Sequence, residues 1–235
     1  MSEQSIQAHF NYHLANSVVR NWPFPHLYYE NVFPDNFYSR LIKSLPDFPV
    51  YDPISKVRPV IKTDGGVAFP DRFVITIDND MKSLGPDWDV ARDVIRSQAT
   101  HIGLLSKFND IIQNRLTEQT NVEPDSILIR DRTNYVLGPH TDNPARLAVL
   151  IIYLPENNEN PHLGTSLYVP KDPMMTCPGT SHYNHSDFDR VFTAPYKPNS
   201  AVAFVKTENS FHGVEPLLAG EERNLIHYFS RIANG

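Results

Sequence analysis

The sequence predicts an α+β protein that is mainly β, with helices first and an all-β half after them. Amphipathic stretches of helical period are confined to the first half, whereas short extended runs separated by Pro, Gly and Asn fill the chain from Ser126 onward. Seven or eight strands at such spacing are typical of a double sheet or barrel. We expect a single domain over residues 1–235, with helix-rich support and leading strands in 1–124 and the β core in 125–235.

Composition narrows the class of protein. Of 235 residues, 40% are hydrophobic and 20% charged, as in an ordinary globular protein, and 20 prolines suit a β-rich fold with many loops. A net charge of −6 argues against nucleic acid or an anionic membrane as a partner. The single cysteine, Cys177, forms no internal disulfide, and the N-terminus lacks a signal-peptide pattern, so we expect a cytoplasmic location.

The first half supplies the expected supports. Ile6, Phe10, Leu14 and Val18 repeat at helical spacing and predict a helix within 2–20. Prolines in 22–30 forbid a helix and a central strand, which favours an extended edge segment. A helix is predicted over 35–45, followed by a proline-rich loop over 46–70.

A strand over 72–77 and the longest helical signal, 87–116, complete this half. Seven side chains form one apolar stripe on that signal and predict a helix or helix pair that packs on a sheet: Trp88, Ala91, Ile95, Ile102, Leu105, Phe108 and Ile112. The second half then supplies the strands, predicted over 127–135, 146–154, 165–169, 190–193, 201–206, 211–217 and 223–232.

Residues 135–144, Tyr-Val-Leu-Gly-Pro-His-Thr-Asp-Asn-Pro, carry the strongest chemical signal. On an extended backbone His140 and Asp142 point to the same face. His212 offers a third ligand, and two His with one carboxylate form the facial triad of non-heme Fe(II) oxygenases. Because His212 lies 70 residues after Asp142 (212 − 142), we expect it on a distant strand that faces the first.

Arg223 follows His212 by eleven residues, across a turn that contains Ala219, Gly220 and Glu221. A hairpin there would place Arg223 on the strand next to His212. A buried arginine needs an anion, which a small dicarboxylate bound to the metal would supply. The alternative is a surface arginine paired with Glu221 or Glu222.

Five elements in this order resemble the 2-oxoglutarate/Fe(II)-dependent dioxygenases, most closely their prolyl-hydroxylase-like branch: 140–146, 150–154, Gly164-Thr165, His212 and Arg223. The resemblance covers about residues 125–232 and implies a double-stranded β-helix, or jelly roll. It implies Fe(II) bound by His140, Asp142 and His212, with 2-oxoglutarate and O2 at the open positions. The far carboxylate of 2-oxoglutarate would meet Arg223 and Tyr153, and Tyr135 would border it.

The implied reaction hydroxylates a C–H bond and releases succinate and CO2, and the presence of Asp142 favours hydroxylation over halogenation. The substrate would be a small, amino-acid-like molecule or a peptidyl prolyl-type residue. Two other hypotheses stay open. A cupin-like jelly roll would use its metal for non-redox chemistry. Such a protein typically has more histidine ligands and needs no arginine in the place of Arg223, so Asp142 and Arg223 argue against this hypothesis. A metal-free binding module would carry the triad only as a vestige.

Several polar residues have no single interpretation. His182 and His185 lie in segment 171–190, either as ligands of a second metal or on a lid over the substrate that also carries Met174, Met175 and Tyr183. Arg146 is placed either to hold substrate or to shape the barrel mouth. Arg130 and Arg132 face either an acidic substrate or the salt-bridged exterior, and His227 and Phe229 alternate inward with Arg223.

Overall fold

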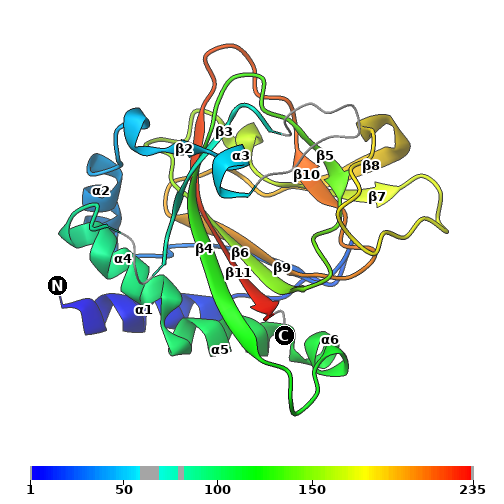
Figure 1. Ribbon diagram of the computed structural model, residues 1–235, viewed down its shortest axis with the longest axis horizontal. Helices are drawn as coiled ribbons and strands as arrows, with labels where there is room; N and C mark the ends of the chain where they lie inside the picture. Colours follow the sequence, from blue (N-terminus) through cyan, green and yellow to red (C-terminus); the bar gives the residue numbers. More distant parts are fainter. Residues whose placement is uncertain (1, 59–68, 79–81, 234–235) are drawn as a thin grey trace.

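A computed structural model describes residues 2–58, 69–78 and 82–233, and these residues form two antiparallel sheets with helices on one side (Figure 1). The strands are β1 His26–Glu30, β2 Asp52–Pro53, β3 Arg72–Thr76, β4 Val122–Asp131, β5 Leu137–His140, β6 Arg146–Tyr153, β7 Ser166–Pro170, β8 Phe188–Thr193, β9 Ser200–Val205, β10 His212–Val214 and β11 Arg223–Ile232. The α-helices are α1 Glu3–Asn16, α2 Asp35–Lys43, α3 Ile54–Val57, α4 Pro86–Arg96, α5 Gln98–Lys107 and α6 Asn109–Ile112.

The described strands divide into a major sheet, in the order β1-β9-β6-β11-β4-β3-β2, and a minor sheet, in the order β5-β10-β7-β8. β11 lies at the centre of the major sheet, between β4 and β6. Because side chains alternate across a strand, Leu225 and Phe229 point to the space between the sheets while Ile226 and Tyr228 point to the helices.

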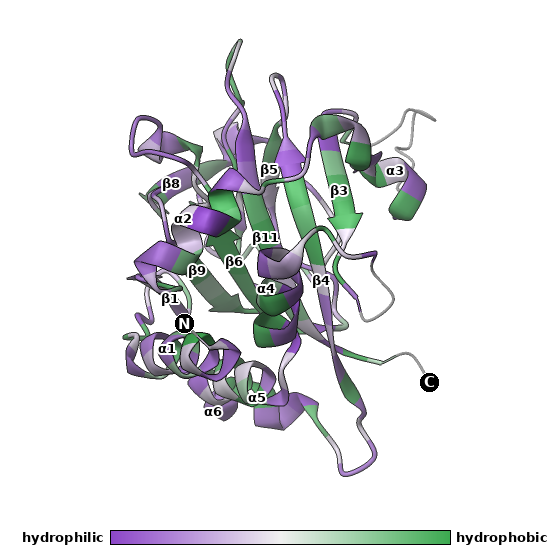
Figure 2. Cartoon of the chain, turned by 90° about the vertical axis from the view of Figure 1, so that its left-hand side faces the viewer, coloured by the Kyte–Doolittle hydropathy of each residue, from purple (hydrophilic) through white to green (hydrophobic). Residues whose placement is uncertain are grey.

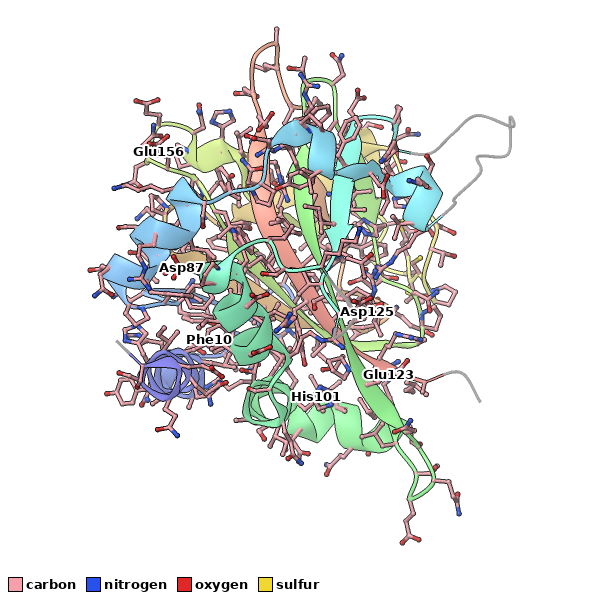
Figure 3. The ribbon with its side chains drawn as sticks, turned by 60° about the vertical axis from the view of Figure 1, so that its left-hand side comes forward. Phe10, Asp87, His101, Glu123, Asp125 and Glu156 are labelled. Atoms are coloured by element: carbon pink, nitrogen blue, oxygen red, sulfur yellow. The ribbon has the colours of Figure 1, made fainter. Side chains whose placement is uncertain are left out.

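Helices α1, α4 and α5 cover the outer face of the major sheet (Figures 1 and 2). Their apolar residues join the outward side chains of β4, β6, β9 and β11 in one buried cluster. Figure 3 shows Phe10 of α1 and His101 of α5 on this side of the molecule, and His101 Nδ1 lies 2.9 Å from the Tyr228 hydroxyl on β11. The helices therefore close one face of the sheet and leave the other for the pocket.

Several elements differ from the sequence expectations. Of the predicted helix or helix pair over 87–116, the structure has the pair, α4 and α5, followed by the short α6; the division is at Ser97, whose extended backbone and side chain cap the start of α5. The break changes the direction of the stripe, so Ile102 is 52% exposed and Leu104 is buried instead. The predicted loop 46–70 contains β2 and α3, and its residues 59–68 lie outside the described part.

The predicted hairpin between His212 and Arg223 is wrong. β10 pairs with β5 and β7 in the minor sheet, whereas β11 pairs with β4 and β6 in the major sheet. The intervening residues 215–222 cross from one sheet to the other, so Arg223 lies on the opposite wall from His212. The extended edge segment was predicted correctly, since β1 lies at one edge of the major sheet. No helix among the described residues has the length and apolar character needed to cross a membrane.

Candidate active site

The predicted triad comes together on the minor sheet. His140 ends β5 and His212 begins β10, and the two are direct partners across the pair of strands. One ligand atom from each of His140, Asp142 and His212 lies within 4.8 Å of the others, and all three residues are buried. They are the only group of this kind among the described residues. His212 therefore lies beside the first ligand strand, not on a strand that faces it.

Backbone carbonyl groups fix both histidine rings. Nδ1 of His140 lies 3.0 Å from the carbonyl oxygen of Gly138, and Nδ1 of His212 lies 2.9 Å from that of Ser210. A carbonyl oxygen only accepts, so each Nδ1 carries hydrogen and each Nε2 presents a lone pair. Burial, followed by the charge of His212, lowers the pKa of His140; burial also lowers the pKa of His212. Both rings are neutral, as metal ligands must be.

Asp142 supplies the negative charge of the group. Burial alone would raise its pKa, but the positive charge of Arg146 first, and then the electrostatic influence of the His212 and His140 rings, bring the pKa below its usual value. Arg146 Nη1 donates to Oδ1, while Oδ2 is buried, has no hydrogen-bond partner among the described residues, and lies 3.6 Å from His212 Nε2. A buried carboxylate oxygen without a donor fits a cation at this position.

A cavity of about 320 Å³ extends from the triad between the sheets. Its middle is apolar, with walls from Ile129, Val214 and Leu225. Among the described residues, its lining includes one carboxylate, Asp142, and four arginines, namely Arg58, Arg72, Arg146 and Arg223. The cavity therefore combines a metal-ligand set with a surplus of cationic side chains.

At one end, Arg72, Asp131 and Arg223 form a ladder across β3, β4 and β11, where they are register partners. Arg72 donates from Nε and Nη2 to the two oxygens of Asp131, at 2.6 and 2.8 Å. Arg223 Nε lies 3.2 Å from Asp131 Oδ2, and its Nη1 donates to the Leu163 carbonyl at 2.8 Å. Two guanidinium groups share one buried carboxylate, which leaves an unbalanced positive charge and fits a further anion.

The two predicted tyrosines lie near this ladder but do not line the cavity. The Tyr153 hydroxyl accepts a hydrogen bond from the Thr165 amide at 2.8 Å. Tyr135 is buried, its ring lies 4.3 Å from the Arg72 guanidinium carbon, and its hydroxyl has no partner among the described residues. The Thr165 hydroxyl, which lines the cavity, is also buried without a partner there. Thr165 is thus better placed than either tyrosine to meet a bound anion.

Within segment 171–190, residues 180–183 pack along the outer edge of β5. Tyr183 N donates to the Pro139 carbonyl at 2.9 Å, and a Cβ at Gly138 would come within 2.4 Å of the Tyr183 carbonyl oxygen. His182 lines the cavity, with its ring centroid 4.7 Å from that of His140, whereas His185 packs against Tyr168. The described residues offer no second metal site there.

The remaining candidate residues from the sequence divide into those that face the cavity and those that do not. His227 lines the cavity and Phe229 is buried in the inner cluster, so both point inward as predicted. Arg130 and Arg132 pair with Glu222, with N–O distances of 3.2 and 3.9 Å, and neither lines the cavity. The sequence analysis missed Arg72, Asp131 and Arg58, because no local motif marks them. Cross-strand pairing brings Arg72 and Asp131 beside Arg223, whereas Arg58 follows α3 and reaches the cavity through its ion pair with Asp125.

Comparison with known proteins supports the architecture. No known family model matches the sequence, and no curated protein matches it significantly. A prolyl-4-hydroxylase from Pseudomonas putida is 14% identical and superposes with a TM-score of 0.51, over 99% of this chain and 100% of the other. A Trichoplax adhaerens prolyl hydroxylase in complex with a peptide fragment of hypoxia-inducible factor is 12% identical, with a TM-score of 0.52 over 98% and 90%.

A prolyl 4-hydroxylase from Phytophthora capsici is 16% identical, with a TM-score of 0.51. The superposition covers 88% of this chain but only 59% of that longer protein. At such identities the similarity establishes the fold. The predicted double-stranded β-helix of the 2-oxoglutarate/Fe(II) oxygenases, in the form seen in prolyl hydroxylases, is confirmed.

Proposed function

We propose that this chain is a non-heme Fe(II)- and 2-oxoglutarate-dependent dioxygenase that hydroxylates a C–H bond of a small molecule or of a peptidyl prolyl-type residue. The observation that carries the proposal is the buried triad of His140, Asp142 and His212, on the fold of such oxygenases. Two neutral imidazole nitrogens and a carboxylate oxygen suit Fe(II) and leave its remaining positions open. Iron, 2-oxoglutarate and O2 together supply the oxidation of C–H to C–OH, with release of succinate and CO2.

The protein side chains have the remaining tasks. Arg223, with Arg72 and Thr165, would hold the far carboxylate of 2-oxoglutarate at the ladder end of the cavity. The apolar band that includes Ile129, Val214 and Leu225 would keep water from the reacting centre. The carbonyl groups behind His140 and His212 would keep both Nε2 atoms directed at the metal.

The test is an anaerobic titration of 2-oxoglutarate into Fe(II)-loaded protein, followed by the metal-to-ligand charge-transfer band in the visible. We expect a saturable band. Arg223→Gln should keep iron but raise the Kd for 2-oxoglutarate more than tenfold, since loss of one partner of a buried charge pair costs about 2 kcal/mol or more. An absent band in protein that has bound iron would refute the proposal and favour a cupin-like enzyme with non-redox metal chemistry.

A further inference from the structure

A second pair of arginines lies at the other end of the cavity. Arg58 and Arg146 both place their guanidinium carbons over the ring of Phe229, at 5.1 and 4.1 Å from its centroid. Phe229 is six residues beyond Arg223 on β11, or about 20 Å along the strand. The side chains of Arg58 and Arg146 are 30% and 20% exposed, against 2% for Arg223. This pair, which we call the mouth arginines, is thus separate from the Arg72–Asp131–Arg223 ladder and closer to solvent.

A bulge in β6 directs Arg146 into the cavity. The pairing of β11 with β6 is regular from Leu225 to Ser230, which lies opposite Ala148, and then shifts so that Arg231 lies opposite Arg146. Strict alternation would point Leu147 inward, but Leu147 packs in the outer cluster against the helices. Arg146 takes the inward position in its place. Bulges next to active sites commonly redirect a side chain in this way.

The mouth arginines have unused hydrogen-bonding capacity. Among the described residues, Arg58 donates only from Nη2, at 2.8 Å to both oxygens of Asp125, which Figure 3 labels on β4. Arg146 donates only from Nη1, to Asp142. Burial lowers the pKa of Arg58; the charge of Arg146 adds to this effect, while Asp125 opposes it. The two guanidinium groups therefore repel each other and retain donors for an anion.

The charges around the cavity do not balance. Among the described residues, four arginines line it, and the carboxylates paired with them are Asp125, Asp131 and Asp142. Arg231, outside the cavity, lies 3.9 Å from Asp125 as well, but it forms its closer ion pair with Glu123, so this arginine and this glutamate together leave the balance unchanged. Fe(II) carries two positive charges and 2-oxoglutarate two negative charges, so these cancel. One positive charge of the protein therefore remains for a further ligand of the cavity, the substrate. A carboxylate carries one negative charge at neutral pH, whereas a phosphate monoester carries more.

We infer that the substrate oxidised at this site carries a carboxylate, which Arg58 and Arg146 bind at the mouth of the cavity beside the metal triad. The inference rests on the proposed function. His227, which also lines the cavity, is available as a neutral partner, because burial and then the charge of Arg146 lower its pKa. A carboxylate held there leaves the rest of the substrate to occupy the cavity near His140 and His212.

The experiment compares N-acetyl amino acids with the corresponding N-acetyl amino amides, across all standard side chains, as ligands of the anaerobic Fe(II)–2-oxoglutarate complex. Binding is measured by calorimetry after the charge-transfer band has been recorded. We expect at least one acid to bind tenfold or more tightly than its amide, with an affinity that falls as salt is added. If no acid binds more tightly than its amide, including the case in which nothing binds, the inference is wrong.

Variants then locate the carboxylate. Arg58→Gln should raise the Kd of the preferred acid at least tenfold and leave that of its amide unchanged, and Arg58→Lys should restore part of the preference. Arg92→Gln is the matched control, because Arg92 pairs only with Asp89 and Asp93 of its own helix α4 among the described residues. An equal loss in both glutamine variants would overturn the assignment to Arg58.

The two proposals fail in different ways. A missing charge-transfer band in the wild-type protein removes the oxygenase function, whereas a normal band without preference for acids removes only the substrate class. The wild-type comparison needs no substitution, so a folding defect in Arg58→Gln would not decide the result.

Discussion

Asp131→Asn isolates the energetic role of the ladder. The substitution keeps the shape of the side chain but removes the charge that Arg72 and Arg223 share. Asp131 has no exposed surface, and the Arg223 side chain is 2% exposed, so water cannot replace the lost partner. Removal of one member of a buried ion pair costs about 3–5 kcal/mol. We expect the free energy of unfolding to fall by about that amount.

The assay is urea denaturation followed by far-ultraviolet circular dichroism, with the slope m compared between variants. Asp87→Asn is the matched control, because Asp87 also accepts from Nε and Nη2 of one arginine, Arg40. That pair is on the surface, with side chains 48% and 27% exposed, and should contribute at most about 1 kcal/mol. A loss for Asp131→Asn no larger than for Asp87→Asn would refute the argument that the ladder is a buried charge network.

Three further outcomes are expected. Asp142→Ala should abolish Fe(II) binding, measured by colorimetric iron analysis after desalting, because it removes the anionic ligand and leaves two neutral imidazoles. Arg72→Gln should keep iron but weaken 2-oxoglutarate, measured by the same charge-transfer titration as Arg223→Gln; an unchanged Kd would remove Arg72 from the subsite. The metal-free protein should lose stability as the pH falls below about 6.5. Burial lowers the pKa values of His140, His212 and His227, so these side chains stay neutral in the folded protein at a pH at which they bind protons in the unfolded chain. Each should contribute a slope of up to about 1.4 kcal/mol per pH unit, and urea titrations that give a flat profile between about pH 5 and 7 would contradict this. Asp142 acts in the same sense, because its pKa is also lowered, in this case by neighbouring charges, but its contribution is lost only in more acidic solution.

Local pattern was sufficient to predict which residues form the buried His-Asp-His group. His140 and Asp142 are two residues apart on an extended backbone, so their common direction follows from strand geometry alone. The prediction of His212 required only that a late strand reach the same surface, and β10 does so, because it pairs directly with β5. The longer helices were predicted from their apolar period, although Ser97 interrupts the 87–116 signal and changes which face is buried, and the short α3 lies in a stretch predicted as loop.

Long-range pairing was not predictable in the same way. The turn before Arg223 suggested a hairpin, because a short turn between two extended runs usually joins neighbouring strands. In this fold the same residues cross between the sheets, which moves Arg223 to the opposite wall. Asp131, the partner of Arg223, lies 92 residues earlier in the chain (223 − 131), and no local signal marks the pair.

The central strand explains why both arginine pairs face the same cavity. Arg223, Leu225, His227 and Phe229 occupy alternate positions on β11 and share its inner face. A shift of one residue in the pairing of β11 would turn this whole row toward the helices and place Ile226 and Tyr228 in the cavity. Regular pairing with β4 along all ten residues of β11 fixes the register. The irregularity in β6 is confined to the end at which Arg146 must turn inward. The register thus holds the ladder in place, and the bulge adds Arg146 to the inner face, beside Arg58 and Phe229.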